Sequence, residues 1–169
     1  MQYDIVMMGH ISKDIIIDET GNESKLYGGA LLYSSIAAAR AGAHVLAITK
    51  AASEDFCALD IAKEQSGIEI LTIRSPKTTS IRNVFLSADH ERRETSLLSR
   101  AEPFSAADIP PNAKTKIIDL AGLFVGELPD KLIEELAPRG AIAYKKTCQI
   151  DYFRLCIRRN VRRRMQRRK

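Results

Sequence analysis

The order of apolar and mixed segments in the amino-terminal part of this chain restricts its fold more than any other feature. Short apolar runs at residues 3–9, 45–49 and 68–73 alternate with two longer segments, 30–41 and 55–66, each followed by a glycine. Apolar runs of this length are typical of buried strands, and a glycine commonly ends a helix. Strands that alternate with helices predict an α/β fold in which helices cover a parallel sheet.

Two segments depart from this alternation. An apolar triplet at residues 15–17 precedes a turn-forming stretch at 18–24, and residues 79–98 contain two strand-like runs around the polar turn at 89–91. Short strands joined by polar turns are typical of ribbons and hairpins. We therefore expect a small β-ribbon and a hairpin rather than additional core strands.

The alternation returns later in the chain. Residues 117–121 predict a core strand, residues 129–137 a helix that begins with proline, and residues 140–143 the start of another strand. A chain of 169 residues is expected to form one domain, or one small domain with an appendage. We therefore expect one packed domain over residues 1–143.

Charge divides the chain at the end of this domain. Residues 1–143 carry 15 Lys and Arg against 20 Asp and Glu, whereas residues 144–169 carry 11 Lys and Arg against a single acid, Asp151. The net charges are therefore −5 and +10. The basic character of the protein belongs to its last 26 residues alone.

Residues 144–169 form a basic tail with two interpretations. The abrupt change to arginine-rich sequence is typical of a reading frame lost in a GC-rich gene, which would make the tail foreign to the fold. The alternative is an evolved basic helix, with apolar residues every four positions, that binds nucleic acid or an acidic membrane surface. The apolar residues are Phe153, Ile157, Val161 and Met165.

The cysteines and the apolar runs exclude several classes of protein. Cys57, Cys148 and Cys156 have neither CxxC spacing nor histidines at ligand spacing, so neither a disulfide framework nor a zinc site is expected. No apolar run approaches the ~20 residues that span a bilayer. We expect a cytoplasmic protein without a membrane span.

Three loops follow predicted strands, where parallel α/β sheets bind their ligands. They contain Gly-His-Ile-Ser-Lys-Asp at residues 9–14, Gly28-Gly29 before the first long helix, and Gly126-Glu127. A glycine pair lets a ligand approach backbone N–H groups, and Asp14 can accept hydrogen bonds from ligand hydroxyls. The alternative is that the glycines form a simple turn and that Asp14 is a solvated loop acid.

The order of these elements resembles the amino-terminal half of the ribokinase-like, or PfkB, family of carbohydrate and nucleoside kinases. The similarity covers residues 4–143 and rests on Gly-x-x-x-x-Asp at 9–14, the glycine pair before an alanine-rich helix, Glu54-Asp55, the hairpin at 79–98 and Gly-Glu-Leu-Pro at 126–129. It implies a Rossmann-like core with a β-sheet lid from segments near 15–27 and 80–98. A sugar or nucleoside would bind between the core and the lid.

The resemblance also implies roles for individual residues. Asp14 matches the acceptor of the sugar hydroxyls, the glycine pair lets the sugar approach the backbone, and Glu127 matches an acid near the sugar. Ser12 and Tyr33 stand where ribose-specific members of the family place asparagines, which argues against ribose as the substrate. The implied substrate-binding residues are Ser12, Asp14, Gly28, Gly29, Tyr33 and Glu127.

ATP and Mg²⁺ are the cofactors that the resemblance implies, with transfer of the γ-phosphate to a substrate hydroxyl. Family members are about twice as long, and their second half carries an Asn-x-x-Glu motif and a Gly-Ala-Gly-Asp motif, neither of which occurs in this sequence. We therefore assign no catalytic residue. The expected protein is a substrate-binding fragment that is inactive alone.

Two other function classes remain open. One is a non-enzymatic binding module whose basic tail contacts nucleic acid or an acidic surface. The other is a dinucleotide-binding oxidoreductase, which is weakened because no GxGxxG follows the first strand. An uncovered sheet edge or the lid would also favour a homo-oligomer.

Overall fold

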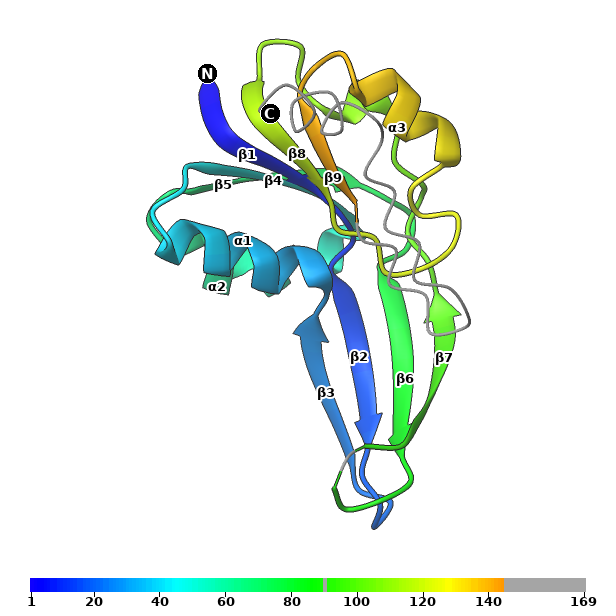
Figure 1. The fold of residues 1–169 in the computed structure, drawn as a ribbon. Coiled ribbons are helices and arrows are strands. Elements are labelled where there is room, and N and C mark those ends of the chain that lie inside the picture. Colours follow the sequence, from blue (N-terminus) through cyan, green and yellow to red (C-terminus); the bar gives the residue numbers. More distant parts are fainter. Residues whose placement is uncertain (90, 145–169) are drawn as a thin grey trace, which may run out of the picture.

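The computed structural model describes residues 1–89 and 91–144, which form two sheets (Figure 1). The larger sheet has the strand order β5-β4-β1-β8-β9, and every neighbouring pair in it is parallel. This arrangement confirms the predicted parallel α/β core. Its strands are β1 (Gln2–Met8), β4 (Val45–Ala51), β5 (Ile68–Arg74), β8 (Lys114–Leu120) and β9 (Ala141–Tyr144).

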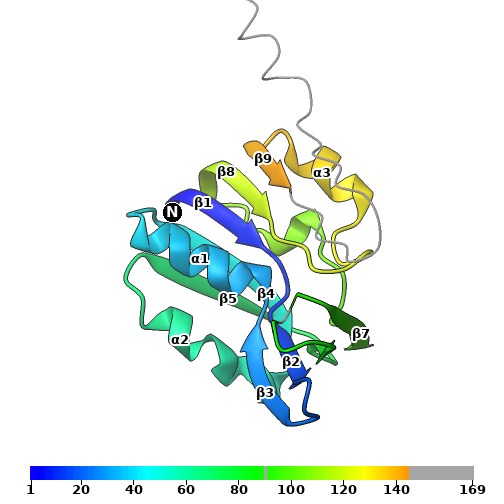
Figure 2. The same cartoon turned by 60° about the horizontal axis from the view of Figure 1, so that its bottom comes forward.

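Helices cover both faces of the larger sheet (Figures 1 and 2). On one face α1 (Ala30–Arg40) packs through Leu31 on Met7, Val45 and Ala47. The opposite face carries α3 (Asp130–Leu136), whose two buried leucines belong to a separate apolar cluster with residues of β1, β4 and β8. The core is therefore split by the sheet into two apolar layers, as in other α/β proteins.

Residues 53–63 differ from the single helix that the sequence predicts. A 3-10 helix, η1 (Ser53–Leu59), leads into a four-residue α-helix, α2 (Asp60–Lys63). Asp55 of η1 is buried and accepts hydrogen bonds from side chains outside the segment. Because tertiary contacts of this kind override local helix propensity, the segment does not form one regular helix.

The smaller sheet is a lid that projects from the carboxyl-terminal edge of the larger one (Figure 1). It has the order β3-β2-β6-β7, with antiparallel pairs at both ends and a parallel pair, β2 and β6, in the middle. The predicted β-sheet lid is thereby confirmed. Its strands are β2 (Ser12–Ile17), β3 (Glu23–Gly28), β6 (Thr79–Phe85) and β7 (Arg93–Ser99).

Residues 145–169 of the basic tail lie outside the described residues. Neither interpretation of the tail is therefore addressed by the fold. In the part of the chain that is described, no helix is long and apolar enough to cross a membrane.

Candidate acceptor site

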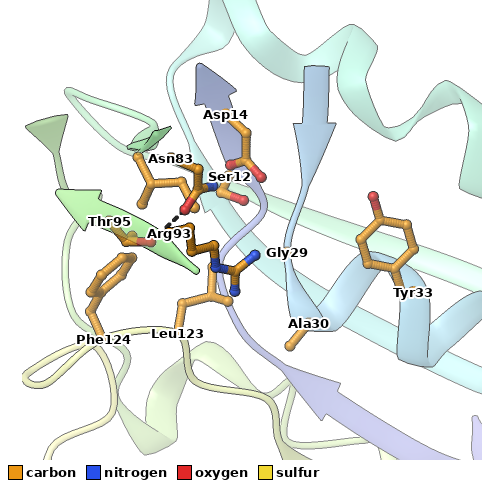
Figure 3. Close-up of a pocket in the computed structure, with 11 residues that line it drawn as sticks. Ser12, Asp14, Gly29, Ala30, Tyr33, Asn83, Arg93, Thr95, Leu123 and Phe124 are labelled. Atoms are coloured by element: carbon orange, nitrogen blue, oxygen red, sulfur yellow. Dashed lines mark hydrogen bonds between the residues drawn. The ribbon is translucent and has the colours of Figure 1, made fainter. Parts of the chain in front are cut away.

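A cavity of about 250 Å³ lies where the lid meets the larger sheet (Figure 3). This volume is slightly below the ~300 Å³ at which drug-sized ligand pockets begin, so it suits a small ligand. The lid contributes Ser12, Asp14, Ile81, Asn83, Arg93 and Thr95. The core contributes Gly29, Ala30, Tyr33, Leu123 and Phe124.

Four of the six residues implied by the resemblance line this cavity, namely Ser12, Asp14, Gly29 and Tyr33. Gly28 lies beside it, because a Cβ atom at this position would be 3.1 Å from Asp14 Oδ2 and 3.5 Å from the Tyr33 hydroxyl. Glu127 does not line the cavity. The structure thus brings together five of the six residues and places the sixth behind the cavity wall.

Asp14 presents an unused acceptor to this region. Its Oδ1 atom is buried and has no hydrogen-bond partner among the described residues. Burial raises the pKa of the Asp14 carboxyl above 3.8, although a hydrogen bond with Ser12 acts in the opposite direction. A buried carboxylate oxygen without a donor costs stability, so this position favours a ligand that supplies one.

Gly29 allows α1 to begin against the connection between β1 and β2. Its φ angle is +111°, and a Cβ atom there would lie 2.7 Å from the His10 carbonyl oxygen and 3.2 Å from Ile11 Cα. Both the angle and the close approach therefore require glycine. This packing brings the first turn of α1 to the cavity, where Ala30 and Tyr33 form part of the wall.

Glu127 holds the loop behind the cavity together. Its side chain is fully buried, and its carboxylate accepts N–H groups from His10 at 2.6 Å, Leu123 at 2.7 Å and Phe124 at 3.2 Å. Leu123 and Phe124 themselves line the cavity. The carboxylate therefore positions two residues of the wall relative to the end of β1.

His10 joins the lid to the core in the same region. Its ring is fully buried. The Nδ1 atom lies 2.8 Å from the Thr79 hydroxyl oxygen, and the Nε2 atom lies 3.0 Å from the Glu102 carbonyl oxygen. A carbonyl only accepts, so Nε2 carries the proton, and burial lowers the pKa of the ring and favours its neutral form. Nδ1 then accepts from Thr79, whose oxygen accepts the Ala101 N–H at 3.1 Å.

Asp55 ties the other side of the lid to the core. Its Oδ1 atom accepts hydrogen bonds from Lys13 Nζ at 2.8 Å and from the Tyr27 hydroxyl at 2.7 Å. The bond to Asp55, together with burial, raises the pKa of Tyr27 to about 12. Strand β2 is therefore held to η1 by the ion pair of Lys13 with Asp55, and β3 is held to it by the hydrogen bond from the Tyr27 hydroxyl.

Three polar residues of the cavity were not predicted from the sequence. Asn83 and Arg93 belong to the hairpin, and Thr95 donates a hydrogen bond of 2.5 Å to Asn83 Oδ1. Asn83 pairs directly with Thr95 and with Ile16, which places it on the same lid face as Asp14. Side chains alternate between the two faces of each strand, so the sequence indicates which residues of one strand share a face. It does not show which residues of neighbouring strands share that face until the pairing register is known.

The described residues contain no group of three or more His, Cys, Asp and Glu side chains that could hold a metal ion. Neither family motif for the metal–phosphate site and the anion hole occurs in the sequence. The ATP and Mg²⁺ that the resemblance implies are therefore not matched by these residues.

Comparison with known proteins points to one fold family. No family model matches the sequence, and no curated protein matches it significantly. Among solved structures, the chain is 29% identical to a pyrophosphate-dependent kinase in the ribokinase family complexed with a pyrophosphate analog and myo-inositol, with a TM-score of 0.74 over 83% of this chain and 48% of that one. A sulfate complex of a pyrophosphate-dependent kinase in the ribokinase family gives 30% identity and a TM-score of 0.72, over 83% of this chain and 49% of that one.

A ribokinase from Cryptococcus neoformans in complex with ADP shares the fold at lower identity. It is 14% identical, with a TM-score of 0.67 over 88% of this chain and 51% of that one. The chain thus spans about half the length of the kinases that it matches. Over its described residues the chain therefore has the ribokinase-like fold and matches about half the length of solved kinases of that family.

Proposed function

We propose that this chain binds a small polyhydroxylated acceptor, a sugar or a cyclic polyol, in the cavity between the lid and the core. The observation that carries the proposal is the buried Oδ1 atom of Asp14, which has no partner among the described residues. A hydroxyl of the acceptor supplies the missing donor through a charge-assisted hydrogen bond. The amide of Asn83 and the hydroxyl of Thr95 offer further polar groups on the same lid face.

The solved relatives support a polyol as the acceptor class. One was solved with myo-inositol, and another concerns the conversion of a pyrophosphate-dependent myo-inositol-1 kinase into a myo-inositol-3 kinase by two substitutions. These relatives are 26–30% identical to this chain. Because they depend on pyrophosphate, ATP as the phosphoryl donor remains a prediction from the resemblance.

The proposed role is that of the acceptor side of a phosphoryl transfer. Such a reaction needs a positioned γ-phosphate or pyrophosphate and a base for the attacking hydroxyl. The cavity positions the hydroxyls, and the 169-residue sequence lacks the two family motifs that serve the donor. We therefore propose that this chain, as a separate polypeptide, binds an acceptor without phosphorylating it.

Calorimetric titration of the chain with myo-inositol, ribose and adenosine tests this function. Asp14→Asn keeps the shape of the side chain but removes its charge, so the affinity for the bound acceptor should fall at least about tenfold. Glu94→Gln is the matched control, since Glu94 is an exposed acid of β7 that does not line the cavity. Equal binding by the parent and Asp14→Asn would refute the proposed site.

A further inference from the structure

The two sides of the cavity differ in chemical character. The lid brings carboxylate, amide, hydroxyl and guanidinium groups, and Ile81 is the one apolar side chain that it contributes among the described residues. Figure 3 shows Asp14 and Asn83 on one side of the cavity and Ala30 and Leu123 across from them. A ligand in this space therefore meets polar groups on its lid side and hydrocarbon on part of its core side.

Leu123 and Phe124 form the apolar part of the core side. Both side chains are hydrocarbon, and both line the cavity. Their backbone N–H groups donate to Glu127 Oε2, at 2.7 and 3.2 Å. Because these donors are used inside the protein, this part of the wall offers a ligand hydrocarbon contact rather than hydrogen bonds. The same two bonds fix the wall before a ligand binds, which lowers the cost of ordering it.

The ring of Phe124 is accessible to a ligand. The residue is only partly buried, and neither of the aromatic pairs found among the described residues includes it. The face of an aromatic ring carries partial negative charge, which attracts the positive end of a C–H bond. A carbon that bears a hydroxyl has a polarised C–H bond of this kind. Phe124 therefore suits the C–H face of a polyhydroxylated ring.

A six-membered polyol ring in its chair form has two distinct faces. Equatorial hydroxyls project from the rim, whereas each axial hydroxyl projects from one face. A face without axial hydroxyls carries only C–H bonds, so it packs on hydrocarbon without leaving a hydroxyl unpaired. An axial hydroxyl directed at Leu123 and Phe124 would lose its hydrogen bonds to water and gain none. An open-chain polyol has no fixed face and must be ordered when it binds.

Given the proposed acceptor site, we propose that the acceptor is a six-membered cyclic polyol that places a face free of axial hydroxyls on Leu123 and Phe124. Its other face and its rim direct hydroxyls toward Asp14 and Asn83 on the lid. Leu123 and Phe124 determine specificity, because they disfavour stereoisomers that carry an axial hydroxyl on each face. The inference rests on the proposed function and narrows its substrate class to rings of this stereochemistry.

Three inositol stereoisomers test this specificity, because each carries one hydroxyl on every carbon of the same ring. scyllo-Inositol has no axial hydroxyl, myo-inositol has one, and neo-inositol has one on each face. Each is titrated calorimetrically into the full 169-residue chain and into Leu123→Ala, Phe124→Ala and Val125→Ala. Val125 is an exposed neighbour in the same loop that does not line the cavity, so Val125→Ala is the matched control. Circular dichroism melting verifies that each variant is folded.

We expect scyllo-inositol and myo-inositol each to bind at least about tenfold more tightly than neo-inositol. Leu123→Ala and Phe124→Ala should each reduce this preference, because the shortened side chain admits water beside the axial hydroxyl, whereas Val125→Ala should preserve it. The ratio of affinities separates specificity from a merely structural role, which would weaken the binding of all three isomers alike.

Three results would overturn the inference and leave the proposed function intact. They are an order of affinities in which neo-inositol is not the weakest ligand, a preference that is unchanged in both Leu123→Ala and Phe124→Ala, and binding of ribose or adenosine without binding of any inositol. If none of these five compounds binds, both the inference and the proposed function fail.

Discussion

Replacement of Glu127 by glutamine tests whether this residue holds the cavity wall or contacts the substrate. The resemblance implies a substrate contact, whereas its carboxylate accepts three backbone N–H groups inside the protein. Glutamine has almost the same shape but only one acceptor oxygen. Its amide nitrogen must then face either the His10 N–H or the N–H groups of Leu123 and Phe124.

The size of the effect follows from these contacts. A buried N–H group that loses its acceptor costs ~1–3 kcal/mol, and Glu127→Gln removes the acceptor from at least one such group. For a domain of this size, each kcal/mol shifts the melting temperature by ~2–4 °C, so a decrease of about 2–12 °C is expected. Glu127→Ala would leave all three N–H groups without their acceptor, and the combined cost would reach much of the ~5–15 kcal/mol that stabilises a typical domain.

Circular dichroism melting of the parent, Glu127→Gln and Glu135→Gln measures this difference. Glu135 is an exposed residue of α3, so its substitution should leave the melting temperature within about 1 °C of that of the parent. A melting temperature unchanged by Glu127→Gln, together with a loss of acceptor binding, would refute the structural role. It would support the substrate contact instead.

Three further predictions concern other parts of the chain. Because the pKa of Asp14 is raised in the folded state, the folded protein binds more protons at this carboxyl than the unfolded chain does, and the free energy of unfolding falls as the pH rises through that pKa. Asp14→Asn should therefore melt at a higher temperature than the parent at pH 7. The difference between the two melting temperatures should disappear below pH ~4. Removal of residues 145–169 should abolish salt-sensitive retention on heparin and leave acceptor binding unchanged, whereas retention by the truncated chain would place a polyanion site in the acidic body. In coupled assays with ATP or pyrophosphate and a panel of sugars and polyols, the chain alone should show no acceptor-dependent turnover, and acceptor-dependent release of ADP or phosphate would contradict this.

The alternation of apolar and helical segments was sufficient to predict the parallel sheet, whereas the lid was implied by the resemblance to the ribokinase-like family. Each strand carries its own signal in the sequence, and the carboxyl ends of parallel strands meet at one edge whatever their exact order. This rule explains why Ser12, Asp14 and Gly29 could be placed near one another before any contact was known. The rule applies only to residues next to the ends of the parallel strands, so it does not place residues that lie farther along the lid strands.

Asn83, Arg93 and Thr95 could not be assigned in the same way. They belong to strands whose pairing fixes which side chains share a face, and a shift of one residue would turn all three away from the cavity. Sequence patterns do not determine the register between β2 and β6, which are separated by more than 60 residues. Glu127 illustrates a second limit, since the same carboxylate satisfies a ligand or a set of backbone N–H groups, and only the tertiary fold decides between them.

The walls of the cavity come from segments far apart in the sequence, so its shape depends on how the lid is joined to the core. On one side His10 connects Thr79, the first residue of the hairpin, with Glu102, which follows the hairpin, and Glu127 accepts a hydrogen bond from the His10 N–H. On the other side Asp55 binds two residues of the first lid strands. The contacts of His10 with Thr79 and Glu127 are buried, and the others are partly buried. A hydrogen bond that is not made in such surroundings costs more than at the surface, so these contacts favour one orientation of the lid. Affinity for the acceptor should therefore respond to substitutions at these junctions, even though none of the joining side chains lines the cavity.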